Sequence, residues 1–354
     1  MWKRTPPSSH AVASALAELQ GCERATLLPS TLHLFFDLFE VLRREGVRLY
    51  VDAGAYPMAR WGAERAASRG ALLRQFRHYD PVSAQHMLEQ DSASGLRPVI
   101  LADGFCPDCG RAAPLPEYLR CVTWDRGYVV LDDTQALGIW GEAPTELNPY
   151  GSGGGGSLRL HNIYSPGVIV GSSLAKGFGV PLAVLGGGAK LISQFIQRSE
   201  TRVHASPPSS AVLHAAGHAL MVNAARGDAI RRHLAELVTC FREQNRRVGL
   251  SGPHGIFPVQ AVLSDPHRDP SRLQRILRTA GLRTLVVRER SVPVEKLLFV
   301  FNALHRMEDI DQATNILAAL DGRCARQPHA PEQGRLYPGY KASGGRWQAN
   351  WRMH

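Results

Sequence analysis

Two short segments contain residue types that together suit the chemistry of an aldehyde cofactor. Lys176 lies in Gly-Ser-Ser-Leu-Ala-Lys-Gly-Phe-Gly (171–179), directly after the apolar run 167–170. Asp132 follows a second apolar run, 128–131, and opens Asp-Asp-Thr-Gln-Ala-Leu-Gly (132–138). A lysine forms a Schiff base with the aldehyde of pyridoxal phosphate (PLP), and an acid keeps the pyridine nitrogen protonated. The pair therefore predicts a PLP site.

The phosphate of such a cofactor needs N–H and hydroxyl donors, and the sequence offers both. Ser173 lies just before Lys176, and Ser30-Thr31 open an apolar-periodic segment that predicts a helix. Free N–H groups at a helix start bind phosphate, although an ordinary N-cap explains Ser30 and Thr31 equally well. A solvated turn lysine and a strand-end cap are the corresponding structural alternatives for Lys176 and Asp132.

The segments around these residues alternate between apolar strands and amphipathic helices. Strands are predicted at 25–28, 47–52, 71–76, 98–103, 128–131, 167–170 and 181–186, and helices at 10–20, 31–44, 58–70, 83–90, 115–120 and 190–198. Such alternation is typical of an α/β fold with a mostly parallel sheet. Ligands bind beyond the carboxyl ends of parallel strands, and Tyr56, Asp132 and Lys176 all follow predicted strands.

A second, smaller block follows the lysine segment. Helices are predicted at 210–225, 227–247, 271–280 and 309–320, and strands at 257–262, 285–287 and 297–301. We therefore expect a large α/β domain at 1–225, a smaller α+β domain at 226–325 and a loose basic tail at 326–354. The glycine-dense stretch 151–156 is interpreted as a flexible loop, with a lid over the site as the alternative.

The order of these motifs resembles that of the PLP-dependent α-oxoamine synthases, the family of 8-amino-7-oxononanoate synthase, 2-amino-3-ketobutyrate-CoA ligase and serine palmitoyltransferase. The similarity runs from about His10 to about Leu320 and rests on segments 132–138, 173–179, 206–208 and 303–311. It implies the class I/II aminotransferase fold (fold type I). It also implies a transferase that binds an amino acid or amine as an external aldimine and acylates its α-carbon from an acyl thioester, carried by CoA or by acyl carrier protein.

The resemblance assigns roles residue by residue. Lys176 would hold PLP as the internal aldimine and later move the α-proton, and Asp132 would pair with the pyridinium nitrogen. Tyr56 would stack on the ring, and Gln135 would donate a hydrogen bond to the phenolic oxygen. The phosphate contacts would come from Ser30, Thr31, Leu32, Ser172 and Ser173, and from Ser206 of a neighbouring subunit, which implies a homodimer.

The sequence departs from the family pattern at three points. The N-terminal arm and the glycine-rich segment after it are missing, which predicts a more open site. Leu298 stands in place of the arginine that binds the substrate carboxylate, and Arg288 or Lys296 is the candidate to replace it. Tyr56 and Gln135 stand where the family has histidines.

Composition indicates an ordinary globular protein, and we expect no nucleic-acid or membrane partner. The 354 residues are 44% hydrophobic and 20% charged, and the net charge of +10 comes largely from scattered arginines. No apolar run approaches the ~20 residues that span a bilayer, and no signal-peptide core follows the N-terminus, so we expect a cytoplasmic location. Cys106-Pro-Asp-Cys109 is a lone close pair, a weak zinc or redox signal, and we expect reduced thiols and no metal.

Two other functions stay open at this point. An aminotransferase, or another PLP enzyme of carbanion chemistry, would share the fold but accumulate pyridoxamine phosphate when given an amino donor without acyl-CoA. A non-catalytic subunit would keep the fold and support an active partner, although the retained Lys176 argues against it.

Overall fold

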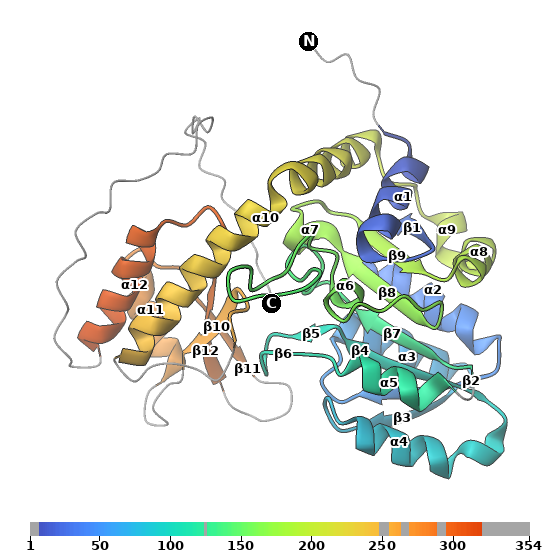
Figure 1. The fold of residues 1–354 in the computed structure, drawn as a ribbon. Coiled ribbons are helices and arrows are strands. Elements are labelled where there is room, and N and C mark those ends of the chain that lie inside the picture. The colour runs from blue at the N-terminus through green and yellow to red at the C-terminus, as the bar shows by residue number, and fades with distance from the viewer. Residues whose placement is uncertain (1–6, 124–125, 248–254, 263–268, 289–294, 321–354) are drawn as a thin grey trace.

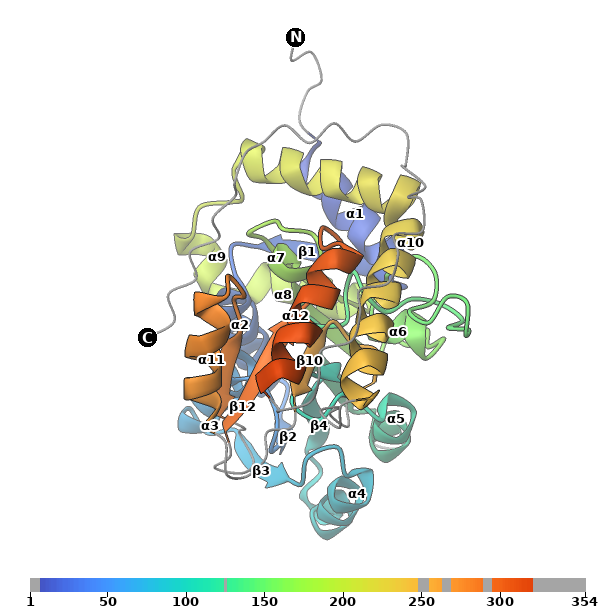
Figure 2. The same cartoon turned by 90° about the vertical axis from the view of Figure 1, so that its left-hand side faces the viewer.

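The computed structural model describes residues 7–123, 126–247, 255–262, 269–288 and 295–320. Figure 1 shows a large α/β region and a smaller sheet region, which are connected by the long helix α10 (Ser210–Arg247). Figure 2 shows α11 and α12 on the side of the smaller region that faces the viewer. In the described residues, no helix is long and apolar enough to cross a membrane.

A seven-stranded sheet forms the centre of the large region, with strand order β1-β9-β8-β7-β4-β2-β3. Strand β9 runs antiparallel to both of its neighbours, and the other pairs are parallel. The predicted α/β fold with a mostly parallel sheet is therefore confirmed. The strands are β1 (Arg24–Leu28), β2 (Val47–Asp52), β3 (Leu72–Phe76), β4 (Arg97–Asp103), β7 (Tyr128–Asp132), β8 (Val168–Ser173) and β9 (Ala183–Gly187).

Helices cover both faces of this sheet, which explains the near-continuous apolar strands. One face of the sheet is covered by fully buried side chains of α2 and α8, among them Phe35, Phe39 and Ile192. The other face is covered by α5, whose Leu115 and Tyr118 are fully buried. The helices of this region are α1 (Ser9–Gln20), α2 (Thr31–Arg43), α3 (Pro57–Ser68), α4 (Pro81–Gln90), η1 (Ser92–Ser94), α5 (Leu115–Thr123), α6 (Ser157–Leu160), α7 (Leu174–Gly177), α8 (Ala189–Arg198) and α9 (Glu200–His204).

The smaller region has an antiparallel sheet of order β10-β12-β11. Its core joins Phe299 and Leu297 of the sheet to Phe241 of α10, Leu277 of α11 and Leu317 of α12. The elements are β10 (Val259–Val262), α11 (Pro270–Thr279), β11 (Leu285–Arg288), β12 (Glu295–Val300) and α12 (Met307–Leu320). A short hairpin of β5 (Phe105–Cys106) and β6 (Arg111–Ala112) projects from the large region toward this sheet (Figure 1).

The two helices predicted at 210–225 and 227–247 are wrong, because α10 is one helix of 38 residues. Gly227 lies within this helix and is buried. A Cβ at this position would lie 2.5 Å from Asn223 Oδ1 and 2.9 Å from Arg231 Nη2. Glycine therefore serves close packing here and does not end the helix. The division into domains at residue 225 stays a prediction, and that boundary falls inside α10. The tail at 326–354 lies outside the described residues.

The glycine-rich stretch 151–156 is not the flexible loop that its composition predicts. The N–H of Gly153 donates to Asp228 Oδ1 at 2.9 Å, and Asn223 Nδ2 donates to the Gly153 carbonyl at 2.9 Å. Gly154 has φ +72°, and a Cβ there would lie 2.4 Å from the Arg231 guanidinium. The glycines let this loop lie directly against α10, which holds it in place.

The carboxyl ends of the parallel strands meet at one edge of the large sheet. Asp103 of β4 pairs in register with Asp132 of β7, which pairs with Gly171 of β8. Ser173 then pairs with Ala183 of β9, and Ala183 pairs with Leu28 of β1. The segments that carry Ser30, Tyr56, Asp132 and Lys176 therefore all leave the sheet at the same edge.

Candidate active site

Asp132 is a buried carboxylate at the end of β7, with 5% of its surface exposed. Its Oδ1 accepts a hydrogen bond from the N–H of Thr134 at 3.1 Å, and Thr134 Oγ1 accepts from the N–H of Ser173 at 3.0 Å. Thr134 thus ties the end of β7 to the end of β8. Sequence reasoning passed over this residue, because a threonine two positions after an acid carries no chemical signal of its own.

Lys176 lies in α7, a single helical turn that directly follows β8. The Ser173 hydroxyl caps this turn by accepting from the N–H of Ala175 at 3.3 Å, and Leu174 anchors it with a fully buried side chain. The lysine segment also packs on the aspartate segment, since a Cβ at Gly177 would lie 2.4 Å from the Leu137 carbonyl oxygen. A glycine after the lysine is what lets the two motifs touch.

Tyr56 faces the lysine from the end of β2. Lys176 Nζ lies 5.7 Å from the centroid of the Tyr56 ring. Tyr56 is 38% exposed. The backbone N–H of Tyr56 donates to Asp103 Oδ1 at 2.8 Å, and Asp103 itself is buried at the end of β4. The structure therefore brings Lys176 and Tyr56 together, and the hydrogen bond to Asp103 holds the tyrosine segment.

Ser30, Thr31 and Leu32, which were predicted to contact the phosphate, lie at the N-terminus of α2. Ser30 is the N-cap residue, but its side chain makes no capping hydrogen bond and pairs with His33 Nδ1 at 2.8 Å. The first turn of α2, with Thr31 and Leu32, contains no acidic residue. A helix start that lacks a side-chain capping hydrogen bond and an acidic residue in its first turn is a favourable place for an anion.

The two serines before the lysine differ in orientation. A Cβ at Gly171 would meet Leu34 and Phe35 of α2 at about 3 Å, so that position faces α2. Side chains alternate along a strand, and Ser173 therefore shares this face whereas Ser172 points to the other. Ser172 is fully buried, and its hydroxyl has no partner among the described residues. The geometry favours Ser173 over Ser172 as a phosphate ligand.

The remaining predicted site residues are less constrained. Gln135 is half-buried in the loop after β7, and Ser206 is exposed between α9 and α10, where its predicted contact is with a second subunit. Lys296 Nζ donates to the Asp108 carbonyl oxygen at 3.4 Å, which places it against the β5–β6 hairpin. The backbone of Arg288 ends β11, and its side chain lies outside the described residues.

The second acid of the aspartate motif, Asp133, has a structural role. It is fully buried, and burial raises the pKa of this carboxyl to about 7, although hydrogen bonds from Ser157 oppose the shift. The N–H of Ser157 donates to Oδ2 at 3.0 Å, and the Ser157 hydroxyl donates to Oδ1. Asp133 thus fastens the start of α6 beneath the site, while Asp132 is the acid at the strand end.

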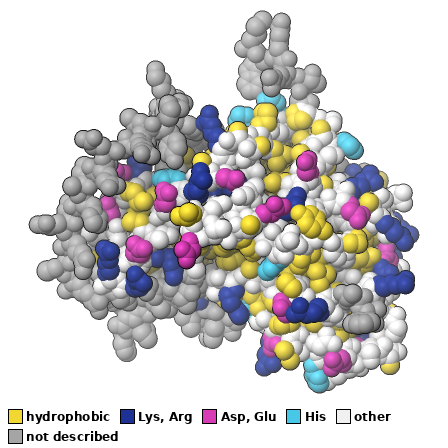
Figure 3. All heavy atoms as spheres, viewed as in Figure 1, with side chains coloured by type: hydrophobic (Ala, Val, Ile, Leu, Met, Phe, Trp, Pro, Cys, Tyr) yellow, Lys and Arg dark blue, Asp and Glu magenta, His cyan; other side chains and the backbone are white. Residues whose placement is uncertain are grey.

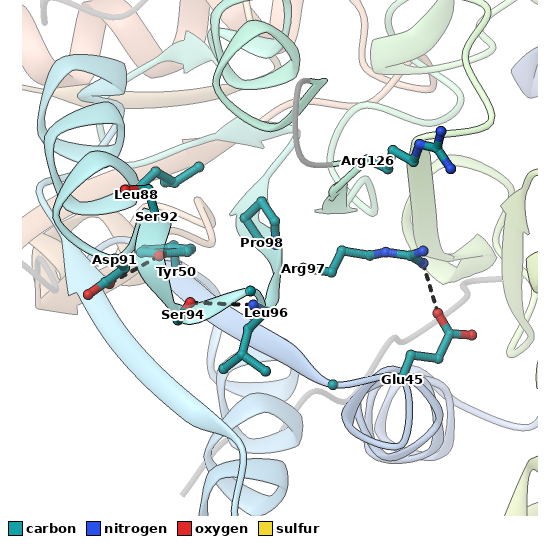
Figure 4. A pocket seen from close by; sticks show the side chains of 12 residues that line it. Glu45, Tyr50, Leu88, Asp91, Ser92, Ser94, Leu96, Arg97, Pro98 and Arg126 are labelled. Atoms are coloured by element: carbon teal, nitrogen blue, oxygen red, sulfur yellow. Dashed lines mark hydrogen bonds and ion pairs between the residues drawn. The ribbon is translucent and has the colours of Figure 1, made fainter.

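A separate hollow lies at the opposite edge of the same sheet, where β2, β4 and β7 begin (Figure 4). Within its lining, Arg97 Nη1 contacts Glu45 Oε2 at 3.0 Å, and Asp91 accepts a hydrogen bond from Tyr50 OH at 3.0 Å. Ligands of parallel α/β sheets bind at the other edge.

On the face drawn in Figure 3, basic, acidic and apolar side chains of the described residues are interspersed.

The residues at the carboxyl edge fit PLP. Lys176 and Tyr56 face each other, so that an amine and an aromatic ring are placed together. Asp132 offers a buried carboxylate, the form of acid that keeps a pyridine nitrogen protonated. The start of α2 and the Ser173 hydroxyl supply N–H and O–H donors of the kind that a phosphate needs.

Solved structures and curated sequences resemble this chain over most of its length. Serine palmitoyltransferase of Sphingomonas wittichii superposes with a TM-score of 0.77 at 18% identity, covering 90% of this chain and 78% of that one. The 8-amino-7-oxononanoate synthase of Francisella tularensis gives a TM-score of 0.72 at 17% identity, covering 90% and 89%. These similarities define the fold as fold type I of the PLP-dependent transferases.

The sequence relatives are more specific than the fold. The 8-amino-7-oxononanoate synthase of Halorhodospira halophila is 28% identical over 319 residues, which cover 88% of this chain and 75% of the relative. The 8-amino-7-oxononanoate synthase of Hahella chejuensis is 27% identical over 312 residues, which cover 87% of this chain and 74% of the relative. No family model matches the chain. These similarities support the PLP-dependent α-oxoamine synthase family that the motifs predicted.

Proposed function

We propose that this chain is a PLP-dependent acyltransferase that joins the α-carbon of an amino acid to the acyl group of a thioester. The observation that carries the proposal is the convergence of Lys176, Tyr56 and Asp132 at one sheet edge, in a chain that is similar to 8-amino-7-oxononanoate synthases over 88% of its length. In the overall reaction a C–C bond forms, the C–S bond breaks, the amino-acid carboxylate leaves as CO2 and one proton is taken up.

The cofactor supplies an electron sink that makes an α-carbanion accessible. Lys176 Nζ would hold the cofactor aldehyde and would then remove or return the α-proton of the substrate. Asp132 would keep a proton on the pyridine nitrogen, and its burial would keep that contact away from bulk water. Tyr56 would cover one face of the ring, and Gln135 would donate a hydrogen bond near the phenolic oxygen. Ser30, Thr31, Leu32 and Ser173 would orient the phosphate, with Ser172 as the predicted ligand that the strand geometry favours least.

Substrate recognition and assembly extend the proposal. Leu298 is buried in β12, so a cation elsewhere must bind the substrate carboxylate, and Lys296 or Arg288 of the neighbouring strand positions is proposed for this role. A homodimer is proposed in which Ser206 of one subunit reaches the phosphate site of the other. The acyl donor is an acyl-CoA or an acyl carrier protein, and the proposed location is the cytoplasm.

The test is a thiol-release assay on the PLP-loaded protein. A panel of amino acids is combined with acyl-CoA thioesters, and free thiol and CO2 from carboxyl-labelled amino acid are measured together. We expect release of both in equal amounts, only when both substrates are present. An acyl carrier protein thioester in place of CoA distinguishes the two donors.

Other outcomes would replace the proposal. Amino-group transfer to the cofactor, without need of a thioester, would identify an aminotransferase. Binding of PLP without turnover, together with activation of an added partner enzyme that Lys176→Ala leaves unchanged, would identify a non-catalytic subunit. Lys190→Ala, which alters an exposed lysine of α8, is the matched control.

A further inference from the structure

Three potential metal ligands from two separate loops converge beside the carboxyl edge of the large sheet. The ligand atoms of His78, Cys106 and Cys109 all lie within 4.8 Å of one another. Cys106 is buried, and His78 and Cys109 are half-buried. His78 follows β3, whereas the cysteines lie in the β5–β6 hairpin. Among the described residues, no fourth His, Cys, Asp or Glu joins this group.

The hairpin has the geometry of a metal-binding cysteine turn. The N–H of Gly110 donates to the Cys106 carbonyl at 2.9 Å, and β5 and β6 pair Cys106 with Arg111. Gly110 has φ +69°, a left-handed conformation that favours glycine. Cys-Pro-Asp-Cys-Gly therefore closes a tight turn that brings the two sulfur atoms near each other, in the Cys-x-x-Cys spacing common at zinc sites.

A buried carboxylate sets the orientation of His78. Asp52 is fully buried, and its Oδ1 lies 2.6 Å from His78 Nδ1. This contact places Nδ1 against an acceptor of hydrogen bonds and leaves Nε2 facing Cys109 Sγ, 3.3 Å away. Histidine ligands of metals usually donate their other ring N–H to a carboxylate in this way. Asp52 therefore prepares Nε2 to bind a cation.

The backbone holds His78 in this place. The next residue, Tyr79, has φ +51°, which is unusual for a non-glycine residue, and its N–H donates to Asp52 Oδ2 at 2.8 Å. A Cβ at Gly54 would lie 2.3 Å from His78 Nδ1, so the imidazole fits only against glycine. A strained residue that several contacts hold in position is a frequent feature of functional sites.

We propose that His78, Cys106 and Cys109 bind one Zn²⁺ ion, with Asp52 as the positioning residue and the fourth coordination place open to water or another ligand. Two thiolates and one imidazole are a donor set that suits Zn²⁺. This differs from the expectation of no metal, because the sequence places His78 far from the cysteine pair and gives no signal that the fold joins them.

The ion would cross-link the segment after β3 of the large sheet to the β5–β6 hairpin. The hairpin in turn contacts the smaller region: the Phe105 ring stacks on Phe257 at 4.0 Å between centroids, and Lys296 Nζ reaches the Asp108 carbonyl oxygen. Asp103, which holds the Tyr56 segment, lies just before this hairpin and accepts a hydrogen bond from Tyr79 OH at its carbonyl oxygen. Zinc would thus stiffen the structure beside the PLP site without taking part in PLP chemistry.

The test measures metal in the purified PLP-loaded protein by mass spectrometry of the elements. We expect about one zinc per chain, less than a tenth of that in Cys106→Ser and Cys109→Ser, and a clear loss in His78→Ala. The control is Cys121→Ser, which changes a half-buried thiol of α5 and should keep the zinc. Zinc that stays in both serine variants, or wild-type protein without zinc that does not take it up when supplied, would overturn the proposal.

A measurement on the wild type keeps the test decisive if a variant fails to fold. The thiols are alkylated in the folded protein with and without a zinc chelator, and the modified cysteines are mapped by peptide mass spectrometry. We expect Cys106 and Cys109 to be protected until the chelator is added, with Cys121 unaffected by it. Labelling that the chelator does not change, or a Cys106–Cys109 disulfide in freshly purified protein, would point to a redox or nucleophilic thiol and contradict the zinc site.

Discussion

The two edges of the large sheet differ in how their polar groups are arranged. At the amino edge, Arg48 and Arg74 both contact Asp91, and Arg97 contacts Glu45, so opposite charges lie close along neighbouring elements. At the carboxyl edge, an amine faces an aromatic ring and a helix start lacks its side-chain cap. We therefore assign the charged hollow at the amino edge a structural role, and the proposed PLP chemistry belongs to the carboxyl edge.

The largest expected difference between the edges concerns Lys176. Replacing it by alanine removes the amine that is proposed to bind the cofactor and move the proton, so we expect the thiol-release rate to fall at least about a thousandfold. The rate is measured with the thiol-release assay at saturating PLP. Lys190→Ala should keep wild-type activity, and a Lys176→Ala protein with normal turnover would remove the basis for placing the chemistry at this edge.

The next effect compares one aspartate from each edge. Asp132→Asn keeps the shape of the side chain but cannot hold a proton on the pyridine nitrogen, so we expect the rate to fall about a hundredfold. Asp91→Asn alters the amino edge and should leave the rate unchanged. Equal losses in the two variants, measured in the same assay, would show that the comparison of edges has no functional meaning.

A smaller effect is expected at Tyr56. An aromatic stack contributes about 1 kcal/mol, so Tyr56→Ala should weaken PLP binding about fivefold in a fluorescence titration. Tyr56→Phe keeps the ring and should bind PLP as the wild type does. A loss of the same size in Tyr56→Phe would assign the role to the hydroxyl and not to stacking.

The amino edge should matter for stability alone. The hydrogen bond from Arg48 lowers the pKa of Asp91 to about 2, with Arg74 and Tyr50 acting in the same direction. A carboxyl whose pKa is lower in the folded state stabilises the fold above its unfolded value near 4, and this contribution is lost as the pH falls toward 2.

Asp91→Asn should therefore lower the free energy of unfolding at pH 7 by about 2 kcal/mol, as measured by urea denaturation. The difference from the wild type should shrink as the pH is lowered from about 4 toward 2. A difference that stays constant across this range would show that the charge of Asp91 is not what stabilises this edge.

Much of the large sheet and of the site was predictable from the sequence, because the signals are local. Apolar runs followed by Tyr56, Asp132 and Lys176 predict strand ends, and the parallel topology then brings these ends to one edge. What the sequence did not show depends on contacts between distant segments. The role of Thr134 depends on the hydrogen bond that it accepts from the N–H of Ser173, which is distant in the sequence. The role of Asp103 likewise depends on the hydrogen bond that it accepts from the N–H of Tyr56.

Two predictions near glycines were wrong for the same physical reason. A break between helices was placed just before Gly227, and the 151–156 stretch was interpreted as flexible, yet α10 runs through the first position and binds the second. In both, glycine allows close approach to Arg231. Composition alone does not distinguish a glycine that allows close packing from one that gives freedom of movement.

The most direct test of the central claim is to locate the lysine that binds PLP. The chain has five lysines, at positions 3, 176, 190, 296 and 341. The PLP-loaded protein is reduced with borohydride, digested and mapped by peptide mass spectrometry. The account predicts one pyridoxyl phosphate group per chain, attached to Lys176 alone. Attachment to Lys190 or Lys296, or no attachment in protein that is shown to bind PLP, would contradict it.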